Sequence, residues 1–456
     1  MSIKEIDVVI IGAGLSGLSS ALELNKQKIP FVVLEARNRA GGRIHSINLE
    51  GDVPIDLGAQ WISPYHERVK KLVGDYGLRL VTTYRKGKTI YDIDGVIQES
   101  EGAWPKMSLI EKVDVWNFKK ELNSLSNQIR CDQPWESKMA RELDQKTLEE
   151  FLQKHTYTKL ARSFCRLLLE EALCSKLYEV STLDLLWCIK TAGSIDRLLT
   201  AEDFWIEEGA ESLVKRVSES LDGKILYGSP VKTINYEDHQ AIIYTDDQTL
   251  KAKKLILALP PNLVARIKFA PPLPANRAQL NERAGLPSVI KIIFVYNNPF
   301  WRERGLSGIA YSNQGPVKLT IDSSPPNSKK GVLTALITGD FAQQLTDWSS
   351  QKRKEEARKN LARFFGEEAI HTREIYEENW SAEEWTRGGY GTHFSPGVIT
   401  QFGKTIFKPI GPLHWAGTET ATEWRMYMEG AVQSGERAAK EVIEYLNGGI
   451  FSRILF

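Results

Sequence analysis

The sequence predicts a mixed α/β fold, part α/β and part α+β, in which two lobes are interleaved along the chain. Three observations predict it. An apolar, β-branched run at residues 7–11 is followed directly by a glycine-rich turn, a helical pattern and a second apolar run. Residues 231–261 alternate strand patterns with acidic turns, whereas residues 81–204 are rich in helix formers. At 456 residues the chain is longer than one ordinary core, so we expect more than one domain.

The composition excludes two classes of partner. Apolar residues make up 42% of the chain and charged residues 26%, which is ordinary for a globular enzyme. The formal net charge of +1 gives no electrostatic reason to expect nucleic acid or acidic membranes. No run of about 18 uninterrupted apolar residues occurs, so no transmembrane segment is predicted. The short apolar tail 450–456 is expected to dock on the protein's own surface, because membrane anchoring needs more apolar area.

The cysteines indicate a reducing compartment. They lie apart without a CxxC pair, so the sequence predicts neither a metal site nor a disulfide framework. The four are Cys131, Cys165, Cys174 and Cys188. A first strand that begins by Asp7 leaves no room for a cleaved signal peptide. We therefore expect a cytoplasmic protein.

The N-terminal unit has the spacing of a dinucleotide-binding turn. In the run Gly-Ala-Gly-Leu-Ser-Gly, Gly12 permits the tight turn, Gly14 lets the backbone approach a pyrophosphate and Gly17 lets the helix pack on the strand. The pyrophosphate then lies at the helix N-terminus, where unpaired N–H groups favour negative charge. Glu35 ends the second strand and is placed to accept hydrogen bonds from a ribose. Dinucleotide binding is therefore predicted over a coincidental glycine turn.

A second glycine-rich loop begins at that acidic residue. Residues 35–43 read Glu-Ala-Arg-Asn-Arg-Ala-Gly-Gly-Arg, where the glycines free the backbone to wrap a second phosphate face and the last arginine adds a forked cationic donor. With residues 55–61, this segment resembles the second fingerprint of FAD-containing amine oxidases, in which that arginine contacts the cofactor pyrophosphate. The resemblance assigns Arg37, Gly42 and Arg43 to cofactor binding, and a surface arginine is the alternative for Arg43.

The C-terminal segment 415–439 carries a stronger resemblance, to flavin monoamine oxidases. It contains Ala-Gly-Thr-Glu near its start and Tyr-Met-Glu-Gly further on. In that family a Gly-Thr-Glu loop meets the flavin phosphates and ribityl chain, and a helix that begins near the methionine points its N-terminus at the isoalloxazine ring. The resemblance thus implies cofactor contacts for Gly417, Glu419 and Met428. Further matching segments are 259–261, 288–295 and 380–397, so the resemblance covers nearly the whole chain and is weakest in 81–204.

A member of this family has a Rossmann-like FAD-binding lobe of the glutathione-reductase type with an interleaved substrate-binding lobe. Because motifs at both ends of the chain must converge on one cofactor, we assign residues 1–80, 205–285 and 395–456 to a discontinuous FAD-binding domain. Residues 81–204 and 286–394 are assigned to the substrate-binding domain.

The resemblance also implies the reacting groups. Monoamine oxidases hold the amine between two tyrosines in front of the flavin, and segment matching gives Tyr390 and Tyr427 for this aromatic cage. Lys291 lies in an apolar strand, where a charge is costly unless it is paired or functional. The family places a lysine here that is bridged through water to the flavin N5. Core packing of the tyrosines and an outward-facing lysine are the alternatives.

Other positions follow from the same match. Trp380 and Val231 are expected to contact the cofactor, with a plain core residue as the alternative for Trp380. Leucines on a helix are usually core residues, but Leu198 and Leu199 match gate positions of the family's cavity. The predicted substrate-binding residues are Leu198, Leu199, Gln60 and Trp61.

One departure from the family concerns how the cofactor is held. In mitochondrial monoamine oxidases the residue before the first cage tyrosine is a cysteine that binds FAD covalently, and here it is Gly389. None of the four cysteines lies in that segment. We therefore expect FAD to bind non-covalently and to be lost on dilution or unfolding.

Two arginines, Arg387 and Arg425, are out of pattern. An arginine that reached the cavity would clamp a substrate carboxylate and turn an amine oxidase into an amino-acid oxidase. We expect solvated surface positions for both, because most arginines are exposed.

The sequence thus predicts an FAD-dependent oxidase of primary or secondary amines, with a small-molecule amine and O2 as partners. Hydride passes from the amine α-carbon to flavin N5, the imine hydrolyses to an aldehyde or ketone, and oxygen reoxidises the flavin with release of hydrogen peroxide. An L-amino-acid or polyamine oxidase on the same scaffold stays open, and acidic residues lining the tunnel would mark polyamines. A flavin-binding protein without turnover is a further alternative, and the oligomeric state, a homodimer included, is open.

Overall fold

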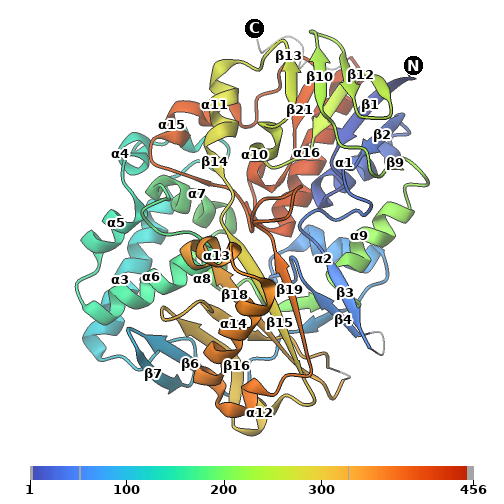
Figure 1. The fold of residues 1–456 in the computed structure, drawn as a ribbon. Helices are drawn as coiled ribbons and strands as arrows, with labels where there is room; N and C mark the ends of the chain where they lie inside the picture. The colour runs from blue at the N-terminus through green and yellow to red at the C-terminus, as the bar shows by residue number, and fades with distance from the viewer. Residues whose placement is uncertain (1–3, 51–52, 327, 449–456) are drawn as a thin grey trace.

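Two β-sheets organise the computed structural model, which describes residues 4–50, 53–326 and 328–448 (Figure 1). Within these residues the first sheet has eight strands, in the order β13-β10-β11-β12-β1-β2-β9, with β21 paired to β12 beside this path. Its strands are β1 (Lys4–Ile11), β2 (Phe31–Leu34), β9 (Ile225–Leu226), β10 (Thr233–Tyr236), β11 (Ala241–Tyr244), β12 (Thr249–Leu257), β13 (Lys268–Ala270) and β21 (Leu413–Trp415). Strands β9, β2, β1, β12 and β21 run parallel, and β10 to β12 form the antiparallel meander that the sequence predicts.

The alternation of β1 sorts its side chains between two layers. Val8 and Ile10 pack with α1 (Leu15–Lys26) and α16 (Met428–Leu446), whereas the alternate residues of the strand pack against the meander. Successive strand residues point to opposite faces, so a continuous apolar run needs cover on both sides. The strand starts at Lys4, in agreement with the prediction that the first strand begins by Asp7.

Small residues let α1 and α16 lie against each other. A Cβ on Gly435 would stand 2.2 Å from the Ser16 carbonyl oxygen, so no larger residue fits there without a shift of backbone. The Ser20 hydroxyl donates to the Gly435 carbonyl oxygen at 2.9 Å. The C-terminal helix α16 therefore packs directly on the N-terminal unit.

The second sheet has seven strands within the described part of the chain, in the order β19-β15-β18-β17-β16-β6-β7. They are β6 (Lys88–Ile93), β7 (Val96–Ser100), β15 (Val289–Tyr296), β16 (Leu306–Ser312), β17 (Leu319–Asp322), β18 (Gly331–Thr338) and β19 (Glu374–Asn379). A group of helices lies beside this sheet and shares one apolar cluster (Figure 1). These helices are α3 (Leu109–Ser126), α4 (Ala140–Asp144), α5 (Leu148–His155), α6 (Lys159–Leu173), α7 (Thr182–Ala192) and α8 (Ile195–Leu199).

Short ribbons and further helices complete the described fold. The ribbons are β3 (Ser46–Leu49) with β4 (Val53–Asp56), β5 (Leu80–Thr82) with β8 (Phe204–Ile206), and β14 (Ala284–Gly285) with β20 (His393–Phe394). The helices are α2 (Glu67–Asp75), α9 (Ala210–Glu219), α10 (Pro261–Val264), α11 (Ala275–Arg283), α12 (Phe300–Glu303), α13 (Gly339–Thr346), α14 (Ser350–Phe365) and α15 (Val398–Phe402).

Each sheet draws its strands from one of the two assigned domains. The strands of the first sheet fall in residues 1–80, 205–285 and 395–456, and those of the second fall in 81–204 and 286–394. This distribution is compatible with the two domains, whose boundaries stay a prediction.

Two sequence-based expectations concern membranes. No helix among residues 4–50, 53–326 and 328–448 is both long enough and apolar enough to cross a bilayer. The docking expected for the tail 450–456 lies outside the described residues.

Candidate active site

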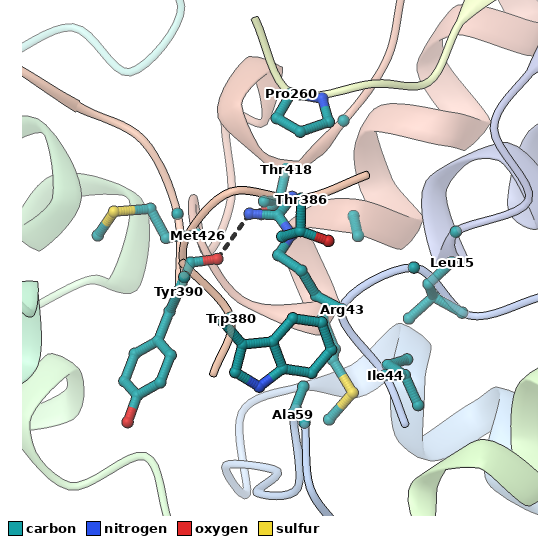
Figure 2. Close-up of a pocket in the computed structure, with 18 of the residues that line it drawn as sticks. Leu15, Arg43, Ile44, Ala59, Pro260, Trp380, Thr386, Tyr390, Thr418 and Met426 are labelled. Carbon is teal, nitrogen blue, oxygen red and sulfur yellow. Dashed lines mark hydrogen bonds between the residues drawn. The ribbon is translucent and has the colours of Figure 1, made fainter. Parts of the chain in front are cut away.

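A cavity of about 430 Å³ lies where the N-terminal turn, the start of α16 and the second sheet meet. Its walls come from the loops after β1 and β2, from β15, and from α6 and α8. Figure 2 shows part of it, with Leu15 and Ile44 toward one side and Tyr390 toward the other. All of the site residues that the sequence predicts line this cavity except Gly17 and Glu419, which lie behind the lining.

In the glycine-rich turn, an added Cβ would clash at two of the glycines and meet open space at the third. Gly12 has a φ of +98°, in the left-handed region that favours glycine, and its Cβ would stand 2.8 Å from the Ala258 carbonyl oxygen. A Cβ on Gly17 would stand 1.9 Å from the Gly12 carbonyl oxygen, so glycine alone lets α1 pack this closely. Among the described residues, no heavy atom beyond its two chain neighbours comes within 4 Å of a Cβ built on Gly14, the N-cap of α1. The N–H groups of the first helical turn therefore face space that an anion can occupy.

The Glu35 carboxylate is fixed at the end of β2. It is 3% exposed and accepts hydrogen bonds from the N–H groups of Ala13 at 2.7 Å and Arg37 at 2.9 Å. These bonds aim the carboxylate at the cavity, where its remaining lone pairs can accept from ribose hydroxyls. The Arg37 guanidinium pairs with Glu383 and donates to the Thr386 hydroxyl at 2.6 Å, so it joins this loop to the segment before Tyr390.

Arg43 connects the second glycine loop with two distant segments. Its Nη1 donates to the main-chain oxygen of Tyr390 at 2.6 Å, a bond drawn in Figure 2, and to Oε1 of Glu419 at 2.8 Å. Glu419 is fully buried, and its Oε2 has no hydrogen-bond partner within the described part of the chain. An unpaired buried carboxylate oxygen is costly. This oxygen therefore fits a ligand that offers a hydroxyl donor, as the ribityl chain of FAD does.

The C-terminal segment closes the cavity from the other side. The Gly417 N–H donates to the hydroxyl oxygens of Ser16 at 2.8 Å and Ser434 at 3.2 Å, which ties this loop to α1 and α16. Helix α16 begins at Met428 with Tyr427 as its N-cap, and both residues line the cavity. The positive end of a second helix dipole is thus directed at the site.

Trp380 and Val231 also reach the cavity. The Trp380 indole, at the centre of Figure 2, is 5% exposed, and its Nε1 donates to the Leu57 carbonyl oxygen at 3.0 Å. Val231 stands at the start of the meander and lines the same space. Both can meet a bound cofactor, although Trp380 is also well packed in the core.

Lys291 points inward from β15. It is 3% exposed, and its Nζ donates to the Gly58 carbonyl oxygen and to Oε1 of Gln60, both at 3.0 Å. Burial lowers the pKa of this ammonium to about 8, and the charge of Asp56 acts in the opposite direction. The lysine is thus an ammonium on the cavity wall that loses its proton more readily than an exposed lysine does, which suits it to hold a water molecule.

The two tyrosines line the cavity in different settings. The Tyr427 hydroxyl donates to the Leu198 carbonyl oxygen at 3.0 Å, and its ring packs edge-on against Trp424 and His66. Tyr390 keeps 39% of its area exposed, and this area opens onto the cavity. Burial within these walls raises the pKa of both hydroxyls well above their ordinary value. Core packing, the alternative for these rings, does not describe Tyr390.

The remaining predicted substrate positions form the cavity wall. Leu198 is 2% exposed and Leu199 is half-buried, so the pair belongs to both the core and the lining. Gln60 is buried and bridges Lys291 to the Ser323 hydroxyl, to which it donates at 3.3 Å. The Trp61 ring centroid lies 4.9 Å from the Lys291 Nζ.

The two out-of-pattern arginines lie outside the cavity lining. Arg387 is exposed at the surface, as expected. Arg425 corrects the sequence-based expectation, because it is fully buried, with Nη2 2.8 Å from Oδ1 of Asp184 and from the Thr392 carbonyl oxygen. A guanidinium is stable in the interior when acceptors satisfy it, and the sequence did not show that Asp184 lies opposite.

Two acidic residues that sequence reasoning missed also line the cavity. Glu171 of α6 is 6% exposed, and Glu202 follows α8 with its side chain 30% exposed. Burial is the largest cause that raises the pKa of Glu171 to about 8 and that of Glu202 to about 7. A signal existed for Glu171, since helical spacing from Phe164 and Leu167 puts it on the buried face of α6. Glu202 lies in a loop and has no periodic signal.

Gly389, the residue from which the sequence predicts a non-covalent cofactor, lines the cavity. A Cβ there would make an ordinary contact with the Val289 side chain at 3.7 Å, so lack of space is not what excludes a side chain. All four cysteines lie in the described part of the chain, are free thiols and stay outside the cavity lining.

The residues present fit a bound FAD. The open N-terminus of α1 offers N–H donors to a pyrophosphate, Glu35 offers acceptors to a ribose, and the unpaired oxygen of Glu419 offers an acceptor to a hydroxyl chain. Past these groups, Lys291 and the two tyrosines line the continuation of the same cavity. Such an arrangement can hold a dinucleotide at one end and a small molecule at the other.

Comparisons with known proteins agree with this geometry. The family model for flavin containing amine oxidoreductases matches residues 15–443. The chain is 33% identical over 446 residues to a flavin-containing amine oxidase of Oncorhynchus mykiss, covering 96% of this chain and 85% of that protein. It is 33% identical over 451 residues to a probable flavin-containing monoamine oxidase A of Dictyostelium discoideum, covering 96% and 98%.

Solved structures of amine oxidases are also similar to this chain. A putrescine oxidase bound to putrescine superposes with a TM-score of 0.93 at 30% identity, covering 97% of this chain and all of that one. The cyclohexylamine oxidase of Brevibacterium oxydans superposes with a TM-score of 0.92 at 29% identity, covering 97% and 99%.

Proposed function

The chain belongs to the family of flavin-containing amine oxidoreductases, and from this premise we propose that it binds FAD non-covalently and oxidises primary or secondary amines at the cavity end formed by Lys291, Tyr390 and Tyr427. The observation that carries the proposal is that these three side chains line one continuous cavity with Gly14 and Glu35. A protein that merely bound a flavin would need neither an inward lysine nor two tyrosines at that place.

FAD is the flavin that the cavity suits best. A pyrophosphate needs the open turn at Gly14, and Glu35 accepts hydrogen bonds from a ribose, which a mononucleotide flavin lacks. Arg43 supplies a fixed cation beside these groups. We assign Gly12, Gly14, Gly17, Glu35, Arg37, Gly42, Arg43, Val231, Trp380, Gly417, Glu419 and Met428 to this cofactor.

When bound, FAD takes a hydride from the carbon that bears the nitrogen and passes two electrons to O2, which becomes hydrogen peroxide. The protein positions and desolvates the amine. Tyr390 and Tyr427 offer aromatic faces that attract the amine and restrict it to a slim shape. Tyr427 is fixed by its bond to the Leu198 carbonyl, so its face is held in place before the substrate arrives. The imine that leaves hydrolyses in water to an aldehyde or ketone.

Lys291 is proposed to act on the oxygen half of the reaction. Its Nζ has two protein acceptors, and an ammonium has three donors, so one N–H remains for a water at the cavity wall. A water held there can accept or deliver the protons that accompany oxygen reduction.

The names of similar proteins narrow the substrate to simple amines. The relatives are monoamine oxidases, and the structural neighbours act on putrescine or cyclohexylamine. An amino-acid oxidase needs a cation for the substrate carboxylate, and neither Arg387 nor Arg425 lines the cavity. We therefore rank amines above amino acids.

An anaerobic absorbance scan tests this proposal. The purified yellow protein is mixed with a panel of aryl-alkyl amines, alkyl amines, polyamines and L-amino acids, and then exposed to air with a peroxide assay. Bleaching by an amine followed by peroxide on reoxidation is the expected result. Flavin that no amine bleaches would refute the oxidase, and bleaching by amino acids alone would favour the second candidate.

Location and assembly are further parts of the proposal. Four free thiols, three of them buried, suit a reducing compartment, so we propose a cytoplasmic protein, which fractionation of cells tests. A homodimer is the assembly that we propose to look for by light scattering.

A further inference from the structure

The two cage tyrosines stand on chain segments that lie directly against each other. Gly391 follows Tyr390, and a Cβ built on Gly391 would stand 2.5 Å from the Cβ of Met426. Met426 in turn precedes Tyr427, and all four residues line the cavity. A larger residue in place of Gly391 would push the two segments apart. The contacts that hold these segments together therefore also set how the two rings face each other.

The segment before Tyr427 has a backbone that needs outside support. Trp424 has a φ of +49° and Met426 a φ of +75°, in the left-handed region that residues other than glycine rarely adopt. Such a conformation persists only where the surrounding structure imposes it. The N–H of Trp424 donates to the carbonyl oxygen of Thr191 at 3.0 Å, and the N–H of Arg425 donates to its hydroxyl oxygen at 3.3 Å. Arg425 lies between the two strained residues, so its contacts bear on the position of Tyr427.

The Arg425 side chain reaches from this segment to the one that carries Tyr390. It is fully buried, and its Nη2 donates to the carbonyl oxygen of Thr392 at 2.8 Å, two residues after Tyr390. The carbonyl oxygen of Tyr390 itself accepts from Arg43 at 2.6 Å. The main chain around Tyr390 is thus held by two arginines. One comes from the proposed cofactor loop and the other from the segment of the second tyrosine.

Asp184 balances the charge of Arg425 without directing the guanidinium. Its Oδ1 lies 2.8 Å from Nη2 of Arg425, yet this oxygen makes no hydrogen bond within the described part of the chain. The hydrogen bonds of the guanidinium go instead to the Thr392 carbonyl oxygen and, at 2.9 Å, to Sγ of Cys188. The second Asp184 oxygen lies 2.9 Å from Nδ1 of His393, on the same segment as Thr392. The arginine is therefore aimed at the backbone beyond Tyr390, and its acid is fixed to the same place.

Stability alone gives no reason for a charge at this position. A buried ion pair seldom stabilises a fold more than well-packed apolar side chains of the same size do. Arg425 also departs from the family pattern that the C-terminal segment otherwise matches. A hydrogen bond that joins two cavity-lining segments is a function that an apolar side chain cannot perform.

We propose that Arg425 is a positioning residue for amine oxidation. Through its bond to the Thr392 carbonyl oxygen it fixes the segment of Tyr390 against the segment of Tyr427, and so sets the separation and angle of the two rings that hold the amine. Arg425 and Asp184 lie outside the cavity lining, so the arginine acts through the tyrosines and does not touch the substrate. The inference rests on the proposed function, because it assigns a role in the same reaction.

The first test separates the rate of the reaction from substrate binding. Arg425→Met keeps an unbranched apolar stem and removes the guanidinium. Anaerobic flavin reduction is measured on the flavin-loaded enzyme against the concentration of the amine that reduces the wild type fastest. We expect the saturating rate to fall about 10- to 100-fold, because a misplacement of about 1 Å costs that much. The dissociation constant should change less than about threefold, since displaced rings still contact the amine.

A second buried arginine supplies the matched control. Arg277 is buried, and its Nη1 donates to the carbonyl oxygens of Thr405 at 2.8 Å and Ile406 at 3.0 Å. It lies outside the cavity lining. Arg277→Met therefore removes the same kind of contact elsewhere in the fold. We expect it to lower the melting temperature while the reduction rate per bound flavin stays at the wild-type value.

A double variant distinguishes positioning from plain stability. Arg425→Met leaves the Asp184 carboxylate buried without its cation, which destabilises the fold whatever the rings do. Arg425→Met combined with Asp184→Asn removes both charges, and it carries the same test if the single variant does not fold. We expect the double variant to regain most of the lost melting temperature while its reduction rate stays at least about tenfold below the wild type. If rate and melting temperature recover together, Arg425 has a structural role alone and the proposal is overturned.

The positions of the rings give a readout that does not depend on turnover. Crystal structures of the wild type, the double variant and Arg277→Met are compared for the distance between the ring centroids of Tyr390 and Tyr427. A change of about 1 Å in the double variant alone is expected. Rings that keep their places overturn the proposal, and the amine oxidase then stands. If no amine reduces the wild-type flavin, the proposed function fails and the inference with it, which is distinct from a variant that turns over as fast as an active wild type.

Discussion

The guanidinium of Arg43 donates a hydrogen bond to the main-chain oxygen of Tyr390, although the two residues stand at opposite ends of the sequence. The same nitrogen binds Glu419. One side chain thus fixes the loop proposed to hold the cofactor, the backbone of one cage tyrosine and the C-terminal Gly-Thr-Glu loop. We therefore propose that cofactor affinity and cage geometry are coupled at this point.

Replacement of Arg43 tests that coupling. In Arg43→Met the cavity loses a cation, and Glu419 is left buried without its partner. Hydrogen bonds to charged groups contribute about 1.5–3 kcal/mol, so we expect FAD to bind about 10- to 100-fold more weakly. Fluorescence titration of the apoprotein with FAD gives the dissociation constant. Arg141→Met, at an exposed position of α4, is the control, and equal affinities in the two variants would contradict the assignment.

Lys291→Met separates the two halves of the reaction. We expect anaerobic reduction by an amine to change little, because Lys291 is proposed to act on the oxygen half of the reaction. Reaction of the reduced flavin with O2 should slow about 100-fold, at the lower end of what a positioned proton donor contributes. Stopped-flow absorbance measures both steps. If the flavin of the variant were reduced slowly but reoxidised at the normal rate, the assignment of Lys291 to the oxygen half of the reaction would be wrong.

Tyr427 allows ring and hydroxyl to be tested separately. Tyr427→Phe keeps the aromatic face and loses only the bond to the Leu198 carbonyl, so kcat/KM for an amine should fall less than about tenfold. Tyr427→Leu removes the face and should lower kcat/KM about 10- to 100-fold. Similar losses in the two variants would mean that the hydroxyl matters and the ring does not.

Glu171 should leave a signature in stability. A carboxyl whose pKa is raised by folding keeps its proton in the native state while the unfolded chain ionises, so the unfolded state binds fewer protons and stability falls as pH rises. Here the loss should extend from about pH 4.5 to about pH 8. Glu171→Gln cannot ionise, so its melting temperature should exceed that of the wild type by a margin that grows to a few degrees at pH 8. A margin independent of pH would show that the carboxyl is not desolvated.

Local patterns were enough to predict the elements that carry the cofactor. Glycines at fixed spacing after an apolar run can hardly serve another purpose than a tight turn and a close helix, and the contacts of Gly12 and Gly17 bear this out. The lysine within an apolar strand indicated that Lys291 needs a partner, but the sequence did not identify it. The acceptors of its hydrogen bonds, Gly58 and Gln60, lie in a loop that is distant in the sequence.

The sequence by itself determined the family and predicted the residues of the proposed flavin site, because these depend on short motifs whose spacing is set by backbone geometry. Only the tertiary structure decided which charged residues face the cavity. Arg425 is out of pattern yet finds Asp184 in the interior, whereas Glu171 and Glu202 look like ordinary helix and loop acids yet open onto the substrate space. Burial and partnership are properties of segments brought together by folding, and no local pattern encodes the charge that will stand opposite.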